Sequence, residues 1–206
     1  MPKFVTLLSG LDSFVATNLY LESDSIGGIA LYFDTGRPQA EIKTVKRMAK
    51  ALTLELDIVK CKPALLDNKN NEPFFPFRNA LFLTYAANIA VGDYDTNILI
   101  TGLGTDSSYP LSGYPDTSMN FISKLTTALN EGMGKELSIN IINPVYGWKR
   151  AQIFKWVKKH HKKFIKESTS CYDATDSTLK QFDWGLGCGA CIHCEARQID
   201  WELSNV

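Results

Sequence analysis

The sequence has little of several features that mark particular classes of protein. Lysine plus arginine and aspartate plus glutamate number 22 each, so the formal net charge is zero and bulk attraction to nucleic acid is not expected. No apolar run is long enough to span a bilayer. The first residues lack the basic, apolar and small-residue order of a signal peptide, because Ser9, Gly10 and Asp12 interrupt it early. These absences predict a cytoplasmic protein that contacts neither a membrane nor nucleic acid directly.

Histidine is also rare, with three residues in the chain. Two of them stand in the basic run Lys-Lys-His-His-Lys-Lys, residues 158–163. Such a run is typical of a solvated helix end, and contact with an anionic partner is the alternative.

Disulfides are not expected in a cytoplasmic chain, so its five cysteines are better interpreted as metal ligands or reactive thiols. Cys171 precedes Cys188, Cys191 and Cys194, which have the spacing CxxCxxC. Four soft thiolates suit tetrahedral zinc, and zinc–thiolate bonds would supply folding free energy to a loop-rich tail. An iron–sulfur cluster, which also takes four cysteines, and a set of free thiols are the alternatives. Cys61 falls on an expected strand and is interpreted as core.

The apolar pattern alternates between strand and helix periods over the first half of the chain. We expect strands at 3–9, 26–34, 54–61 and 96–104, and helices from Ser13, over 39–53 and over 79–91. This alternation predicts an α/β fold with a doubly wound, mostly parallel sheet, in which ligands bind beyond the carboxyl ends of the strands. A helix from about 150 to 163 and the cysteine-bearing tail follow. We therefore divide the chain into an α/β domain, 1–145, and a small helical C-terminal region with the zinc site, 146–206.

The turn Ser9-Gly10-Leu11-Asp12-Ser13 lies between the first strand and the first helix. A helix N-terminus there would direct backbone N–H groups and the helix dipole at an anion. Ser9 and Ser13 add hydroxyl donors, and Gly10 allows close approach of the backbone. Asp12 would repel a phosphate, so it is interpreted as a helix cap or as an indirect Mg²⁺ partner. A purely structural turn is the alternative.

The same turn resembles the pyrophosphate (PP) loop of the N-type ATP pyrophosphatases. Further stretches resemble one branch of that superfamily, the 7-cyano-7-deazaguanine (preQ0) synthases. They are, in chain order, Phe33-Asp34-x-Gly36, Pro76-x-Arg78-Asn79, Gly102, Ser112-Gly113-Tyr114-Pro115-Asp116, Asn143-Pro144, Arg150-Ala151-x-Ile153, Ser170-Cys171-Tyr172 and Cys188-Gly189-x-Cys191-x-x-Cys194-x-x-Arg197. These matches cover nearly the whole chain, and the pairing of Tyr-Pro-Asp with a terminal four-cysteine site is specific to the branch.

The resemblance implies an adenine nucleotide alpha hydrolase-like (PP-loop) fold whose α/β domain binds ATP. It also implies an ATP-dependent ligase that forms C–N bonds. ATP with Mg²⁺ activates the carboxylate of 7-carboxy-7-deazaguanine as an acyl-adenylate, and ammonia converts this to the amide. A second ATP activates the amide for dehydration to the nitrile, which serves queuosine synthesis or 7-deazaguanine modification of DNA. The family is commonly dimeric, so a homodimer is implied.

The resemblance further implies roles for individual residues. The catalytic residues are Ser9, Asp12, Ser13 and Arg78, and the nucleotide-binding residues are Leu8, Ser9, Gly10, Leu11, Asp12, Ser13, Phe33 and Gly102. Arg78, Asn79, Tyr114 and Asp116 bind the substrate, because a carboxylate can accept from the N–H groups of a guanine-like edge. The bland alternatives are a solvated arginine at a helix start and a plain Tyr-Pro-Asp turn.

The sequence departs from the family pattern at several positions. The PP-loop lacks one glycine, the segment after the second strand reads Asp34-Thr35-Gly36-Arg37-Pro38, Thr117-Ser118 replaces the usual Cys-Arg, and Arg150 replaces lysine. These departures indicate a divergent member, and a phage-encoded protein acting in the host cytoplasm is one interpretation. The open alternatives are a member that stops at 7-amido-7-deazaguanine, an adenylating enzyme with another acceptor, such as tRNA or a partner protein's amine, and a zinc-stabilised nucleotide-binding or interaction module without turnover.

Overall fold

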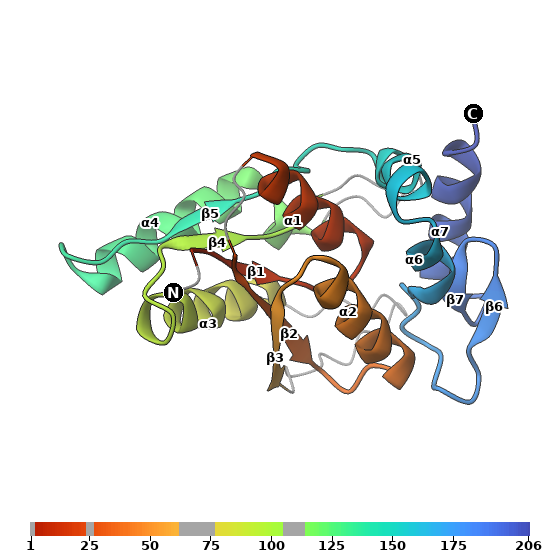
Figure 1. The fold of residues 1–206 in the computed structure, drawn as a ribbon, viewed down its shortest axis with the longest axis horizontal. Coiled ribbons are helices and arrows are strands. Elements are labelled where there is room, and N and C mark those ends of the chain that lie inside the picture. The colour runs from red at the N-terminus through yellow and green to blue at the C-terminus, as the bar shows by residue number, and fades with distance from the viewer. Residues whose placement is uncertain (1–2, 24–26, 62–76, 105–113) are drawn as a thin grey trace.

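A five-stranded parallel sheet forms the centre of the molecule (Figure 1). The computed structural model describes residues 3–23, 27–61, 77–104 and 114–206. The strands are β1 (Val5–Leu7), β2 (Ile29–Asp34), β3 (Glu55–Lys60), β4 (Ile98–Ile100) and β5 (Asn140–Ile142), in the order β3-β2-β1-β4-β5. The chain winds outward from β1 to β3 and then returns to the other side of β1. The crevice between β1 and β4 is therefore the switch point at which such sheets bind ligands.

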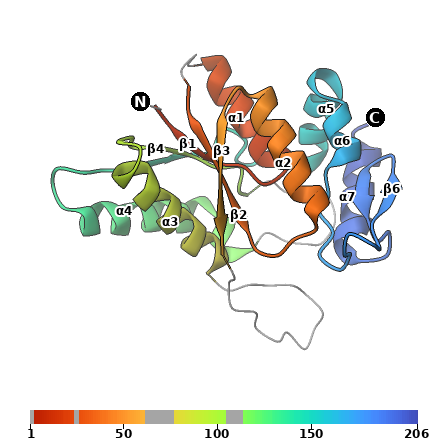
Figure 2. The same cartoon turned by 60° about the horizontal axis from the view of Figure 1, so that its bottom comes forward.

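Helices cover both faces of the sheet, so the α/β part has three layers (Figure 2). On one face lie α1 (Leu11–Ser23), α2 (Gln39–Ala51) and α5 (Arg150–His160), and on the other lie α3 (Arg78–Gly92) and α4 (Met119–Met133), which follows the 3-10 turn η1 (Pro115–Thr117). The remainder is α6 (Lys163–Glu167), a hairpin of β6 (Lys180–Phe182) and β7 (Gly185–Gly187), and α7 (Ile192–Leu203). Figure 1 shows these last elements together at one end of the sheet.

Two apolar cores hold the layers together. Phe14, Met48 and Phe154, from α1, α2 and α5, are fully buried in the first core. Leu83 of α3 is fully buried in the second. Strand β2 contributes to both, since every residue from 29 to 33 is buried. Burial on both faces explains why this strand reads as a continuous apolar run and not as an alternating one.

Hydrogen bonds and an ion pair tie the C-terminal segment to α2. The Asp176 carboxylate accepts from the backbone N–H groups of Gln39 at 3.0 Å and Ala40 at 3.3 Å, so a residue of the tail caps this helix. Further along α2, Arg47 pairs with Glu167 at 2.9 Å. The tail is thereby fixed against the layer that contains α2.

The expected strands and helices of the α/β part are all present. The strands and α2 are somewhat shorter than expected, whereas α1 begins two residues earlier and α3 extends one residue further at each end. The sequence does not predict α4, β5 or the β6–β7 hairpin. In the basic run, Lys159, Lys162 and Lys163 are exposed as expected, but the ring of His161 packs edge-on against Phe14, with 4.9 Å between centroids. The division at residue 145 stays a prediction, since α5 and α6 share a core with α1 and α2.

Cys61 follows β3, is half-buried and contacts the second core, in line with its interpretation as a packing residue. Within the described ranges, each helix is too short or too polar to cross a membrane.

Candidate active site and metal centre

A cavity of about 820 Å³ lies at the carboxyl ends of the strands. Its wall is built from the loops after β1, β2 and β4, from the start of α3, and from the C-terminal tail between 169 and 175. Every predicted nucleotide-binding residue lines it, as do three of the four predicted substrate residues: Leu8, Ser9, Gly10, Leu11, Asp12, Ser13, Phe33, Gly102, Arg78, Asn79 and Tyr114. The fold thus brings together residues that are more than 100 positions apart in the sequence.

The turn after β1 closes on the side chain of Ser13. The Ser13 Oγ accepts from the backbone N–H of Ser9 at 3.0 Å and of Gly10 at 3.2 Å, and donates to the Gly10 carbonyl at 3.1 Å. Two backbone donors therefore converge at the N-terminus of α1, as the anion-loop hypothesis expects. They converge on a hydroxyl, so an incoming phosphate oxygen would replace or share that acceptor.

Gly102, in the segment after β4, packs closely against the backbone of this turn. A Cβ at Gly102 would lie 2.5 Å from the Ser13 backbone nitrogen and 2.6 Å from the Asp12 carbonyl carbon. Real Cβ atoms do not approach backbone so closely, so only glycine allows β4 and the N-terminus of α1 to meet here. A Cβ at Gly10, by contrast, would meet nothing within 4 Å.

Asp12 is the second residue of α1 and not its N-cap, which corrects the capping interpretation. Its negative charge stabilises the guanidinium of Arg197, a buried residue of α7. Burial lowers the pKa of the Arg197 guanidinium to about 10, with the nearby Arg150 charge acting in the same direction. The Arg197 side chain donates to the Trp184 carbonyl at 2.7 Å and to the Ser168 hydroxyl at 2.6 Å, so it ties α7 to the tail while lining the cavity.

The start of α3 and the turn η1 form the predicted substrate side. The backbone N–H of Asn79 donates to the Asp116 carboxylate at 3.2 Å, which holds η1 against the helix N-terminus. Asp116 is 6% exposed and lies behind the surface of the cavity. The Asn79 Nδ2 and the Asp116 Oδ1 are buried and have no hydrogen-bond partner among the described residues. Two buried polar atoms thus remain to be satisfied beside the cavity.

Arg78, at the first position of α3, reaches the tail. Its Nη1 donates to the hydroxyl of Tyr172 at 2.9 Å. Burial opposes the positive charge, yet the pKa of Arg78 is raised, because the Tyr172 hydroxyl and the Asp116 carboxylate stabilise the guanidinium. The solvated alternative for Arg78 is therefore wrong.

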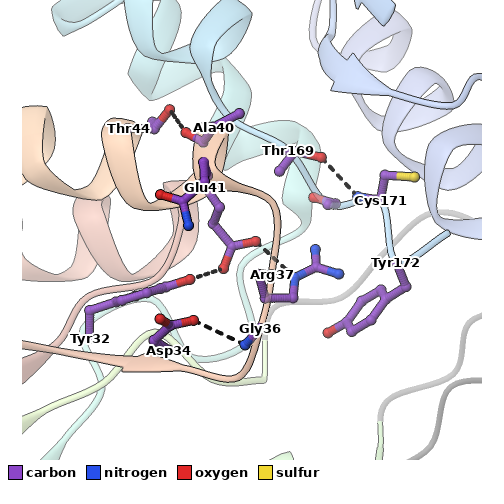
Figure 3. Close-up of polar contacts among 12 residues, drawn as sticks. Tyr32, Asp34, Gly36, Arg37, Ala40, Glu41, Thr44, Thr169, Cys171 and Tyr172 are labelled. Carbon is purple, nitrogen blue, oxygen red and sulfur yellow. Dashed lines mark hydrogen bonds and ion pairs between the residues drawn. The ribbon is translucent and has the colours of Figure 1, made fainter. Parts of the chain in front are cut away.

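Arg37, in the loop after β2, also lies beside Tyr172 (Figure 3). Its guanidinium carbon lies 4.2 Å from the centre of the Tyr172 ring, a cation–π contact. The Arg37 Nε donates to Glu41 at 2.9 Å, and the second oxygen of Glu41 accepts from the Tyr32 hydroxyl, also at 2.9 Å. Gly36 has a φ of +82°, so glycine is required for the turn that precedes Arg37.

The four predicted metal ligands form one cluster. The sulfur atoms of Cys171, Cys188, Cys191 and Cys194 all lie within 4.8 Å of one another. The separations are 3.8 Å for Cys171–Cys191 and 3.8 Å for Cys188–Cys194. A tetrahedral site with zinc–sulfur bonds of about 2.3 Å has sulfur separations of about 3.8 Å. The cluster therefore has the geometry to hold one metal ion.

Backbone donors support the thiolate form of Cys188, whereas burial raises the pKa of the Cys191 and Cys194 thiols. The Cys188 N–H donates to the Cys171 sulfur at 3.4 Å, and the Ala190 N–H donates to the Cys188 sulfur at 3.4 Å. Burial raises the pKa of the Cys188 thiol, but the N–H groups of Ala190 and Cys191 outweigh it and lower the pKa to about 7. A thiol that ionises near neutral pH is suited to metal binding.

Several cavity residues have no role in the sequence prediction. They are Arg37, Glu41, Arg150, Tyr172, His193 and Arg197. His193, between two of the cysteines, is 8% exposed, and burial with the charge of Arg150 lowers the pKa of its imidazole to about 4. Their positions in the sequence could have indicated a place in the site, because Arg37 follows a strand that ends at the crevice and Tyr172 is adjacent to a predicted metal ligand. Ser112, Gly113 and Pro76, which carry part of the resemblance, lie outside the described residues.

The family model described as "Queuosine biosynthesis protein QueC" matches residues 3–204. A curated relative, the 7-cyano-7-deazaguanine synthase of Lawsonia intracellularis, is 35% identical over 159 residues, which are 74% of this chain and 60% of that protein. The chain thus covers less than two thirds of that relative's length. The 7-cyano-7-deazaguanine synthase of Nitratiruptor sp. is 29% identical over 98% of this chain and 94% of that protein.

Two solved structures resemble the fold. The U34-tRNA thiolase NcsA of Methanococcus maripaludis, with its [4Fe-4S] cluster, has a TM-score of 0.52 at 16% identity, over 98% of this chain and 68% of that one. A predicted subunit of tRNA methyltransferase from Methanocaldococcus jannaschii has a TM-score of 0.51 at 18% identity, over 77% of this chain and 75% of that one. Such likenesses bear on fold alone, and they agree with the predicted α/β fold with a mostly parallel sheet.

Proposed function

The chain belongs to the queuosine biosynthesis protein QueC family of enzymes, and we propose that it converts 7-carboxy-7-deazaguanine, ATP and ammonia to 7-cyano-7-deazaguanine. The observation that carries the proposal is that one cavity is lined both by the loop proposed to bind ATP and by three of the four residues proposed to bind the deazaguanine, with the fourth, Asp116, directly behind its wall. Transfer of an adenylyl group to a carboxylate requires this juxtaposition, because the carboxylate must reach the α-phosphate of ATP.

In this proposal, the turn from Ser9 to Ser13 binds the phosphates of ATP, with Leu8, Phe33 and Gly102 completing the nucleotide site. The convergence of two N–H groups on the Ser13 oxygen supports this assignment. Mg²⁺ would accompany the nucleotide, with Asp12 as an indirect partner. The carboxylate oxygen attacks the α-phosphorus, and the bond to pyrophosphate breaks.

On the substrate side, Arg78, Asn79, Tyr114 and Asp116 bind the deazaguanine. The Oδ1 of Asp116 and the Nδ2 of Asn79, which have no hydrogen-bond partner in the part of the chain that the structure describes, are suited to a heterocycle that offers both donors and acceptors. Ammonia attacks the acyl carbon and AMP leaves, which gives the amide. The amide oxygen then attacks the α-phosphorus of a second ATP and pyrophosphate leaves. Loss of AMP and of the two amide protons gives the nitrile. Each step needs orientation and charge stabilisation more than side-chain acid–base work.

The four cysteines would hold one zinc ion with a structural role. They fit this ion because their sulfur separations match tetrahedral thiolate coordination. A closed shell of four protein ligands leaves no position for a substrate. Zinc would thus fix Tyr172 and the start of α7 in the wall of the cavity.

The proposal is tested by mass spectrometry of purified protein incubated with 7-carboxy-7-deazaguanine, ATP, Mg²⁺ and ammonium. We expect the nitrile, together with twice as much AMP as nitrile. Amide alone, with equal AMP, would assign the enzyme to the shorter reaction. Absence of AMP and of both products would exclude the enzyme hypothesis and leave a nucleotide-binding module.

A further inference from the structure

Two arginines from distant parts of the chain meet at one tyrosine of the metal-binding tail. Arg78 donates to the Tyr172 hydroxyl at 2.9 Å, and the Arg37 guanidinium lies 4.2 Å from the centre of the Tyr172 ring. All three side chains line the cavity. Tyr172 directly follows Cys171, so its backbone is anchored where the metal-binding cluster begins.

Arg37 is held rigidly but keeps donors for a ligand. Its side chain is 14% exposed, and among the described residues Glu41 is the one that accepts a hydrogen bond from it, at the Nε edge. Glu41 is itself fixed by Tyr32. The Nη groups of a planar guanidinium are then available for a bidentate or paired contact with an oxyanion.

Resting on the proposed function, we infer that Arg37 and Arg78, positioned by Tyr172, form the subsite that binds the carboxylate group of the substrate. A carboxylate there would accept from one guanidinium while its second oxygen approaches the nucleotide. The two positive charges also offset the repulsion between a carboxylate and the phosphates of ATP.

The position favours a carboxylate over a phosphate of ATP. Arg78 precedes Asn79, whose backbone holds Asp116, so it belongs to the substrate side of the cavity. The turn from Ser9 to Ser13 lies at the N-terminus of α1, where Arg197 and Asp12 interact. Phosphate groups bound by that turn would interact with its backbone N–H groups and with the positive end of the α1 dipole, so they do not require Arg37 or Arg78.

This subsite should distinguish the two organic substrates of the proposed reaction. The acid carries a negative charge, whereas the amide that follows is neutral and has nearly the same shape. Removal of an arginine from the subsite would cost the acid a charge-assisted hydrogen bond, whereas the neutral amide makes no such bond. The ratio of acid affinity to amide affinity therefore reports on the subsite specifically.

The test measures equilibrium binding of 7-carboxy- and 7-amido-7-deazaguanine by calorimetry, with α,β-methylene ATP present so that no turnover occurs. For Arg37→Met we expect the Kd of the acid to rise roughly 10- to 100-fold and that of the amide to change less than about threefold. Tyr172→Phe keeps the ring but removes the hydroxyl that receives Arg78, so we expect roughly a 3- to 10-fold rise for the acid. Arg47→Met is the matched control, because Arg47 pairs with Glu167 outside the cavity.

Unchanged acid binding in both variants, or equal weakening of acid and amide, would overturn the subsite. A rise in the Kd of the ATP analogue alone would assign the arginines to phosphate and also overturn it. Melting temperature and metal content are recorded for each variant, and Tyr172→Phe, which retains packing, remains informative if Arg37→Met does not fold. Failure of the unaltered protein to bind either compound would contradict the proposed function itself.

Discussion

Ser13 is the residue on which the phosphate-loop hypothesis depends most directly. Its hydroxyl receives two backbone N–H groups and returns a hydrogen bond to Gly10. Ser13→Ala removes that organiser, and we expect a loss of AMP formation of about 100-fold or more, as for the removal of other preorganised donors. AMP release is measured by chromatography. Ser23→Ala is the control, since Ser23 ends the same helix and its hydroxyl donates to the Tyr20 carbonyl. Unchanged turnover in Ser13→Ala would remove this loop from the mechanism.

Gly102 tests the same loop from the side of the sheet. Gly102→Ala would place a methyl group 2.5 Å from the Ser13 backbone nitrogen, so the turn or β4 must move. We expect a loss of about 1–3 kcal/mol in the free energy of unfolding and weaker binding of α,β-methylene ATP. Urea unfolding and calorimetry measure the two effects. Gly92→Ala is the control, because a Cβ there meets nothing within 4 Å. Equal behaviour of the two variants would contradict the close approach.

At the scale of elements, α2 depends on the tail for its N-terminal cap. Asp176→Ala removes the acceptor for the Gln39 and Ala40 N–H groups, and we expect a cost of about 0.5–2 kcal/mol in urea unfolding. Asp183→Ala is the comparison in the same tail, where an exposed pair with Lys166 at 3.2 Å should contribute under about 0.5 kcal/mol. If Asp176→Ala costs no more than Asp183→Ala, the cap does not hold the two parts together.

The tail itself should depend on its metal. Its small apolar core consists of Cys171, Ala174, Trp184 and Cys194, so two of these four residues are predicted metal ligands. We expect one zinc and no iron per chain by elemental analysis. We also expect Cys194→Ser to lose the metal and the hydrogen-exchange protection of residues 169–203 while the sheet stays protected. Cys61→Ser, outside the cluster, should retain both. Full protection of the tail in Cys194→Ser would mean that packing alone folds it.

At the scale of the whole molecule, the sequence predicts the sheet well because its signal is local. Long apolar runs such as residues 29–33 are buried on both faces and cannot be mistaken for loops. Strand β5 (NII) and the β6–β7 hairpin (KQF and GLG) contain at most two apolar residues per strand, too few for a strand pattern to register. The equally short β1 lies within the largely apolar segment 4–8, and β4 reads ILI. The cysteine cluster was predictable from spacing. The meeting of Arg37, Arg78 and Tyr172 was not, because it depends on how the tail folds back over the crevice.

That folding back leads to a prediction for the molecule as a unit. The cavity is lined by the turn of residues 9–13 and by tail residues 169–175, so a ligand that fills it should stabilise both. With α,β-methylene ATP and the acid each about 100-fold above its Kd, each ligand adds about 2.7 kcal/mol to the free energy of unfolding. We expect a higher melting temperature and slower hydrogen exchange in both segments, and Ser13→Ala should reduce the effect of the nucleotide. Protection confined to residues 9–13 would show that the tail encloses the site without contributing to binding.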